Sequence, residues 1–207
     1  MSSRGGPIAR PEAAPSGRTI VLGADITSFA DVRRDDGVHS YLRRTMYGTL
    51  ERAAGASRLP WPRCRRDDRG DGAMIVLPPG TRAAGVLDAL PPRLHALLRH
   101  ANHGTSDVQR LRLRLAADVG AVNLDEYGTF GRPFIQVARM LDAPPFKAAM
   151  AAADADVGLL VSDHLFRSAA PPAWPISRDA YRPLRFTCKE TRADAHLWLP
   201  RARPVAR

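Results

Sequence analysis

Two aspartates in this chain are placed where carboxylates can hold divalent cations. Asp71 lies in the glycine turn 69–72 (RGDG), directly before the apolar run 73–77. Asp25 lies near the end of a second apolar run, residues 18–26 (RTIVLGADI). If these runs are neighbouring strands, the two carboxylates can converge, and they then repel each other unless they share cations. Hard oxygen ligands suit Mg²⁺, and a pair of such ions can activate an attacking oxygen and stabilise a leaving phosphate.

A purely structural interpretation stays open beside the metal site. Asp-Gly sequences favour tight turns, so Asp71 can stabilise a hairpin without holding any ligand. In that case Asp25 only caps the segment that follows its strand. The residue types and their spacing leave both interpretations standing.

Hydrophobic patterning predicts the elements that position these aspartates. Residues 18–26 are typical of a buried strand, and residues 38–54 have the apolar spacing of a helix. Arginine and leucine alternate over 109–122, which indicates a strand, and residues 132–143 indicate a helix. The predicted order is β-α-β-β-α-β-α-β-β. It includes a hairpin turning at 67–72 and helical segments on both sides of Pro91-Pro92. A buried strand leading into a short helix is predicted over 156–166, and a closing hairpin over 182–200.

This order of elements favours an α+β fold. A hairpin between the first two helices suits a ferredoxin-like sandwich, with a mostly antiparallel sheet and the helices packed on one face. We expect a leader rich in Gly, Pro and Ala at 1–17, one domain at 18–200 and a basic tail at 201–207.

Composition restricts the compartment and the partners. The chain has a formal charge of +10, and a basic protein attracts anions. Much of the excess lies in arginines near the two ends, so we do not expect nucleic acid as a partner. The first 17 residues lack the apolar centre of a signal peptide, and no segment approaches the ~18 to 20 apolar residues of a membrane span. Two cysteines without CxxC spacing fit a reducing setting, so we expect a cytoplasmic protein without a membrane partner.

Four segments resemble one enzyme family, the class III nucleotidyl cyclases, in their order and spacing. They are ADITSF (24–29), DRGDG (68–72), LRLRLAADVGAV (111–122) and YGTFGRPFIQVARML (127–141). The resemblance covers about residues 18–200. It implies that a nucleoside triphosphate is converted to a 3′,5′-cyclic monophosphate and pyrophosphate. The phosphate-cradling GxxxxGK[ST] string and the GGDEF string are both absent from the sequence.

The resemblance also implies roles for individual residues. Asp25 and Asp71 would hold two Mg²⁺ or Mn²⁺ ions, with help from the Ile26 carbonyl. Arg139 would stabilise charge on the transferring phosphate as the catalytic arginine. Lys189, in TCKET, would bind the terminal phosphates.

The position that reads the base in this family is occupied by an acid. Asp67 stands four residues before Asp71, and a carboxylate accepts hydrogen bonds from N1–H and the exocyclic amine of guanine. Asp67 therefore favours GTP as the substrate. Two positions depart from the family pattern, because Ile135 replaces an asparagine that orients the ribose and Gly128 replaces a second base reader. Gln136 could substitute for that asparagine, and a pyrimidine triphosphate stays an alternative substrate.

In this family the active site forms between two subunits, so the resemblance implies a homodimer with two symmetric sites. The departures at Ile135 and Gly128 motivate an alternative function. The chain would then be a catalytically weak or inactive module that keeps the cyclase fold and serves as a binding or scaffold protein.

Overall fold

The computed structural model describes residues 18–169 and 177–201. The predicted leader 1–17 and residues 202–207 of the predicted tail lie outside the described residues. The helices and strands follow in chain order: β1 (Arg18–Ile26), α1 (Asp36–Ala56), β2 (Arg65–Asp68), β3 (Gly72–Val76), a π-helical turn (Gly85–Ala89), α2 (Leu90–Ala101), β4 (Leu113–Ala121), β5 (Asn123–Asp125), β6 (Gly128–Phe130), α3 (Arg132–Asp142), α4 (Pro144–Ala152), β7 (Val157–Ser162), α5 (Asp163–Ser168), β8 (Tyr181–Cys188) and β9 (Thr191–Trp198), with short 3₁₀ turns at Trp61–Arg63, Asp107–Gln109 and Arg178–Ala180.

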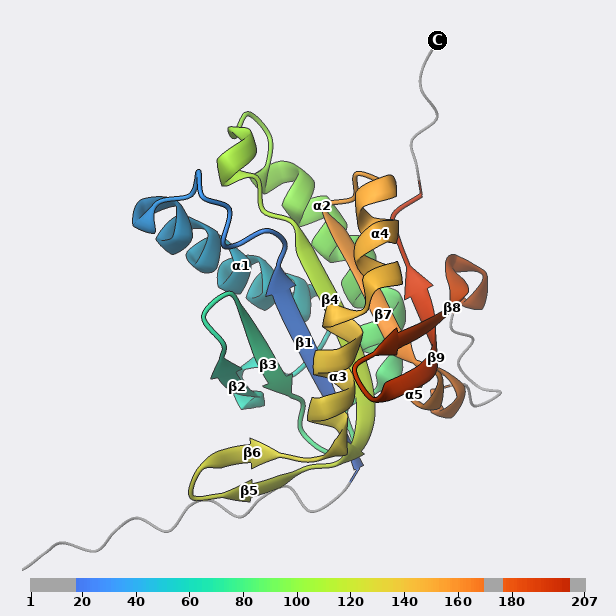
Figure 1. Cartoon of the computed structure of the whole chain (residues 1–207). Coiled ribbons are helices and arrows are strands. Elements are labelled where there is room, and N and C mark those ends of the chain that lie inside the picture. Colours follow the sequence, from blue (N-terminus) through green and yellow to red (C-terminus); the bar gives the residue numbers. More distant parts are fainter. Residues whose placement is uncertain (1–17, 170–176, 202–207) are drawn as a thin grey trace, which may run out of the picture.

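A mixed seven-stranded sheet forms the centre of the molecule (Figure 1). Its strand order is β2-β3-β1-β4-β7-β9-β8, and β4 and β7 are its one parallel pair among the described residues. The predicted α+β class with a mostly antiparallel sheet is therefore confirmed. The order also places β1 between the β2–β3 hairpin and β4, so the strand that carries Asp25 near its end has a neighbour on each side.

The helices cover both faces of this sheet, whereas the sequence-based prediction placed them on one. Alternate residues of β1 explain the division, because Leu22 packs with α1 and α2 while Val21 packs with α3 and α4. Figure 1 shows α3 and α4 in front of the sheet and α1 and α2 behind it. Strand residues alternate between faces, so a strand with apolar residues at every position can bury both.

Two glycines bring neighbouring elements close to β1. A side chain at Gly72 would overlap the carbonyl oxygen of Ala24, so only glycine lets the β2–β3 hairpin approach at this point. A side chain at Gly23 would meet Val137 and Leu141 of α3 at 2.5 and 2.8 Å. Helix α3 therefore lies directly over β1, beside the strand end that carries Asp25.

Residues 123–130 form a small hairpin that the predicted order of elements does not contain. Strands β5 and β6 pair with each other in a separate two-stranded sheet. Figure 1 shows this hairpin projecting from the body of the molecule. None of the helices in the described ranges has the length and apolar character needed to span a membrane.

Candidate active site

A cleft of about 700 Å³ opens between the end of β1, the β2–β3 hairpin and helix α3. All of the predicted metal and catalytic residues line it: Asp25, Ile26, Asp71 and Arg139. The aspartates come from the two strand ends that the patterning predicted, and the arginine comes from the predicted helix. The structure therefore gathers both candidate metal ligands and the candidate catalytic arginine at one place in a single chain.

Backbone pairing holds the two aspartates next to each other. Asp25 pairs with Gly72 in the β1–β3 register, and the Ile26 amide donates to the Asp71 carbonyl over 2.9 Å. Burial raises the pKa of Asp25, Arg114 opposes that shift, and the nearby Asp71 charge raises the pKa further. Two neighbouring carboxylates repel each other, and an added cation would stabilise both in their charged form.

Arg114 already supplies part of that positive charge, and the sequence analysis missed it. It faces Asp25 across the β1–β4 register, and its Nε donates to Asp25 Oδ2 over 2.8 Å. Its Nη2 donates to the same oxygen. The Arg–Leu alternation of 109–122 places Arg114 on the face opposite the leucines, but only the strand register identifies its partner. Asp25 is therefore a structural ion-pair partner as well as a candidate ligand.

The donor set at this site fits a divalent cation. Asp25 and Asp71 offer hard carboxylate oxygens, and Ile26 lines the same cleft. Within residues 18–169 and 177–201, no group of three or more His, Cys, Asp or Glu side chains is gathered to hold a metal. A cation here would thus complete its shell with water and oxygens of a bound substrate, as Mg²⁺ does at phosphate sites.

Positive side chains surround the aspartates in the cleft. Arg139 leaves α3 with only 19% of its side chain exposed, and its Nη2 lies 2.6 Å from Glu190 Oε1. Lys147 of α4 lies 2.9 Å from Asp142. Such a cluster favours a ligand with several negative charges, such as a polyphosphate. The basic residues that line the cleft are Arg69, Arg114, Arg139 and Lys147.

Three predicted substrate-binding residues lie outside this cleft. Gln136 lines a second cleft of about 1060 Å³, together with Glu190. Lys189 lies in the β8–β9 turn with a positive φ of 51°. Asp67 lies on β2 opposite Met74, which lines the first cleft, and its Oδ1 is 3.3 Å from Arg65 Nε. Directly paired antiparallel residues share a face of the sheet, so Asp67 points to the α3 side.

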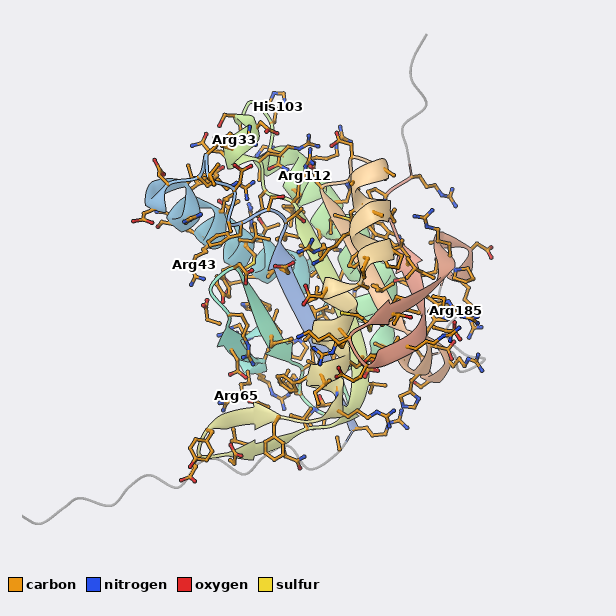
Figure 2. The ribbon with its side chains drawn as sticks, in the orientation of Figure 1. Arg33, Arg43, Arg65, His103, Arg112 and Arg185 are labelled. Carbon is orange, nitrogen blue, oxygen red and sulfur yellow. The ribbon has the colours of Figure 1, made fainter. Side chains whose placement is uncertain are left out.

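The neighbouring Asp68 shapes the hairpin that carries Asp71. Arg43 of α1 reaches the hairpin and lies 2.7 Å from Asp68 Oδ2 (Figure 2). Tyr47 donates to the same oxygen over 2.6 Å, and the Gly70 amide donates to Oδ1 over 2.8 Å. These bonds lower the pKa of Asp68 to about 2, with Arg43 as the largest cause. The turn geometry is therefore set by Asp68 and by Gly70 (φ 85°), and the exposed Asp71 side chain is left available.

The two positions that depart from the family pattern, Ile135 and Gly128, carry no polar side chain. Ile135 of α3 is 57% exposed and borders both clefts. Gly128 begins β6 with a positive φ of 129°. An apolar side chain and a glycine offer no side-chain hydrogen bond to a ribose or a base.

The fold is that of class III adenylyl and guanylyl cyclase catalytic domains. An adenylate/guanylate cyclase/hydrolase from Silicibacter pomeroyi has this fold, with a TM-score of 0.61, 15% identity, and 89% of this chain and 98% of that chain covered. The guanylyl cyclase Cya2 matches with a TM-score of 0.59, 12% identity, and 91% of this chain and 93% of that chain covered. The guanylate cyclase domain of RhGC from Catenaria anguillulae in complex with GTP matches with a TM-score of 0.57, 12% identity, and 90% of this chain and 97% of that chain covered. No protein-family model and no curated protein matches the sequence. The resemblance seen in four motifs is thereby confirmed for the fold.

Proposed function

We propose that this protein is a nucleotidyl cyclase that converts a nucleoside triphosphate, with GTP favoured, to a 3′,5′-cyclic nucleotide and pyrophosphate. One observation carries the proposal. The carboxylates of Asp25 and Asp71 lie at neighbouring strand ends in a cleft that also contains Arg139 and three further basic residues, Arg69, Arg114 and Lys147. The relative from Catenaria anguillulae shares this fold and was solved with GTP.

The residues of the cleft divide the work of binding and charge stabilisation. Asp25 and Asp71 would hold two Mg²⁺ or Mn²⁺ ions, which when bound lower the pKa of an attacking hydroxyl and neutralise phosphate charge. The reaction joins the ribose 3′-oxygen to the α-phosphorus and releases pyrophosphate. Arg139 would donate to the phosphoryl oxygens as their charge develops, while Arg114 and Lys147 would hold the triphosphate at the end of β1.

Asp67 is the basis of the preference for GTP. A carboxylate accepts from the N1–H and amine of guanine but finds no such pair of donors on adenine. Asp67→Lys should reverse the preference between GTP and ATP, because an ammonium group only donates. We expect the ratio of kcat/KM for GTP over ATP to fall at least ~10-fold. The matched control is Asp125→Lys in the β5–β6 hairpin, which makes the same change of charge away from the base-reading position and should leave the ratio unchanged.

We further propose that two copies of the chain complete the site. Gln136 and Lys189, which the family resemblance assigns to substrate binding, do not line the cleft of their own chain. A second copy could bring both residues to the Asp25 and Asp71 pair. The assembly would then be a homodimer with two equivalent sites.

A product assay tests the activity directly. Purified protein is incubated with each of the four nucleoside triphosphates and Mn²⁺, and cyclic products are separated by chromatography and identified by mass. We expect a cyclic nucleotide, formed fastest from GTP. If no cyclic product forms from any of the four at concentrations where the dimer is present, the protein is not a cyclase.

A second candidate function has specific support. Ile135 and Gly128 remove two hydrogen-bonding positions, and Arg114 already neutralises Asp25. These features suit a protein that binds a nucleotide without turning it over and serves as a scaffold. Calorimetric titration with GTP, together with the product assay, separates the two candidate functions. Binding without a cyclic product supports the scaffold, and measurable turnover excludes it.

A further inference from the structure

The candidate catalytic arginine is already held by an acid from another part of the chain. Arg139 Nη2 and Glu190 Oε1 are 2.6 Å apart, although the residues are 51 positions apart in the sequence. Arg139 projects from α3 and lines the cleft that contains Asp25 and Asp71. Glu190 lies in the turn between β8 and β9 and lines the second cleft. The ion pair therefore joins the helix that borders the candidate active site to a hairpin outside that site.

The hairpin fixes the position of this acid. Cys188 pairs with Thr191 in the β8–β9 register, so the turn contains only Lys189 and Glu190. Lys189 has a positive φ of 51°, a backbone conformation that residues other than glycine rarely adopt. A turn this short leaves the backbone of Glu190 little freedom, and its carboxylate is presented to α3. Seventy per cent of the Glu190 side chain is nevertheless exposed, which leaves it free to swing into solvent.

Arg139 keeps hydrogen-bonding capacity that Glu190 does not use. Its Nε is buried and has no hydrogen-bond partner among the described residues. The glutamate raises the pKa of Arg139, and the arginine lowers the pKa of Glu190, so both groups are charged at neutral pH. A carboxylate at this distance cancels much of the positive charge that a phosphate would meet, and it repels the phosphate itself.

We propose that Glu190 is a built-in competitor of the triphosphate for Arg139, so that the β8–β9 turn restrains the candidate active site until a polyphosphate displaces the carboxylate. This inference rests on the proposed nucleotide site. Binding of a triphosphate exchanges one anionic partner of Arg139 for another, and Glu190 moves to solvent. The effect on affinity should be modest, because an exposed ion pair contributes little: we expect about a two- to five-fold change.

Magnesium tripolyphosphate is a suitable probe, because it reports on the phosphate subsite without a base or a chemical step. Its dissociation constant is measured by titration calorimetry for the full chain and for Glu190→Gln at constant ionic strength. The matched control is Asp194→Asn. Asp194 is on the same hairpin, is similarly exposed and pairs with Arg185 over 2.7 Å, but the change leaves the Arg139 pair intact. A third comparison introduces Glu190→Gln into an Arg139→Gln background.

We expect Glu190→Gln to bind the probe about two- to five-fold more tightly than the unaltered chain, and Asp194→Asn to bind it like the unaltered chain. In the Arg139→Gln background, Glu190→Gln should have no further effect, because its competitor role acts through Arg139. Equal affinities for the unaltered chain and Glu190→Gln would overturn the inference and leave the proposed function in place. Equal gains from Glu190→Gln and Asp194→Asn would overturn it too, since net charge alone then explains both. If no variant binds the probe, the phosphate site itself is absent, and the proposed function fails with the inference.

Discussion

The two candidate metal ligands differ in what else they do for the protein. Asp25 is largely buried, with 15% of its side chain exposed, and it pairs with Arg114. Asp71 is exposed, and the contact that fixes it is made by its backbone carbonyl with the Ile26 amide. Changing Asp25 therefore disturbs an ion pair as well as a site. Changing the side chain of Asp71 disturbs only what that side chain binds and the charge that it places near Asp25.

Asp71→Asn is the sharpest single change at the residue scale. The amide keeps the size and turn preference of the aspartate but lacks the charge that a divalent ion requires. We expect the rate of cyclic product formation to fall at least ~100-fold, because the metal lowers the activation free energy by several kcal/mol when it stabilises the developing charge. Mn²⁺ affinity, followed by calorimetry, should fall with it, while the melting temperature stays unchanged.

The control for this change is Asp125→Asn. Asp125 likewise lies in a hairpin turn, where its Oδ1 accepts from the Tyr127 amide over 2.9 Å, but this β5–β6 hairpin is outside the cleft. The Asp125→Asn variant should retain the activity and the Mn²⁺ affinity of the unaltered chain. If Asp71→Asn unfolds the chain, or binds Mn²⁺ as the unaltered protein does, Asp71 is only a turn residue.

Local signals in the sequence were enough to predict that Asp25 and Asp71 lie near strand ends and that residue 139 lies on a helix, whereas the family resemblance supplied the role of Arg139. Each lies at the end of an apolar run, in a glycine turn or on a periodic helix, and neighbouring residues determine these features. Arg114 and Glu190 could not be found this way. The first requires the β1–β4 register, and the second requires a contact between residues 51 positions apart.

At the scale of elements, the β2–β3 hairpin decides where Asp71 stands. Gly72 permits its close approach to β1, and Asp68 ties it to α1 through Arg43 and Tyr47. The hairpin was predictable because DRGDG combines turn residues with a following apolar run. The β5–β6 hairpin was not, because strands of three residues are too short to show an alternating pattern.

Gly72→Ala tests the close approach of the hairpin. The added methyl group would overlap the Ala24 carbonyl, so β1 and β3 must separate where Asp25 and Asp71 meet. We expect a loss of roughly 2–4 kcal/mol in the free energy of unfolding, measured by urea denaturation. Gly48→Ala is the matched control, since nothing lies within 4 Å of the added methyl in helix α1. It should stabilise the chain by roughly 0.5–1 kcal/mol through helix propensity, and a similar loss in both variants would contradict the overlap.

Asp68→Asn tests the tie between the hairpin and α1. The pKa of Asp68 is about 2 in the folded chain and 3.8 in its ordinary state, so the ionised form stabilises the fold above pH about 4. That stability is lost as the pH falls through the lowered pKa. Because 46% of the side chain is exposed, we expect a difference of only about 1 kcal/mol between the unaltered chain and Asp68→Asn at pH 7. In denaturation curves the difference should vanish between pH 4 and 2, and a difference that persists at pH 2 would show that the charge is not its cause.

At the scale of the whole molecule, the order of elements was enough to predict an α+β sandwich with a mostly antiparallel sheet. The division of helices between two faces was not predictable from periodicity. An apolar stripe shows that a helix buries one side, but it does not show which face of the sheet receives it. That division matters for the site, because it puts α3 and its Arg139 on the face toward which Asp25 points.

Mixing two inactive variants tests whether a second copy completes the site. In the proposed homodimer each site combines the aspartates of one chain with Gln136 and Lys189 of the other, so Asp71→Asn and the double variant Gln136→Ala/Lys189→Ala damage opposite halves. Mixed dimers then contain one intact site of two, so an equal mixture should recover about a quarter of the unaltered activity. Neither variant alone should show activity at any concentration. No recovery, with mixed dimers verified by mass spectrometry, would show that the second copy does not supply Gln136 and Lys189 to the site.

The pairing of Asp25 with Arg114 has a consequence for how such a site changes during evolution. Losing Asp25 leaves a mostly buried guanidinium without its partner, which costs several kcal/mol, so selection for stability alone retains this aspartate. The exposed side chain of Asp71 has no such second role and is free to drift once turnover no longer matters. A descendant that has lost the reaction should therefore still carry Asp25 and Arg114, while its residue at position 71 varies. In comparing related chains, position 71 is the informative marker of activity, and an aspartate at position 25 by itself reports only that the fold is intact.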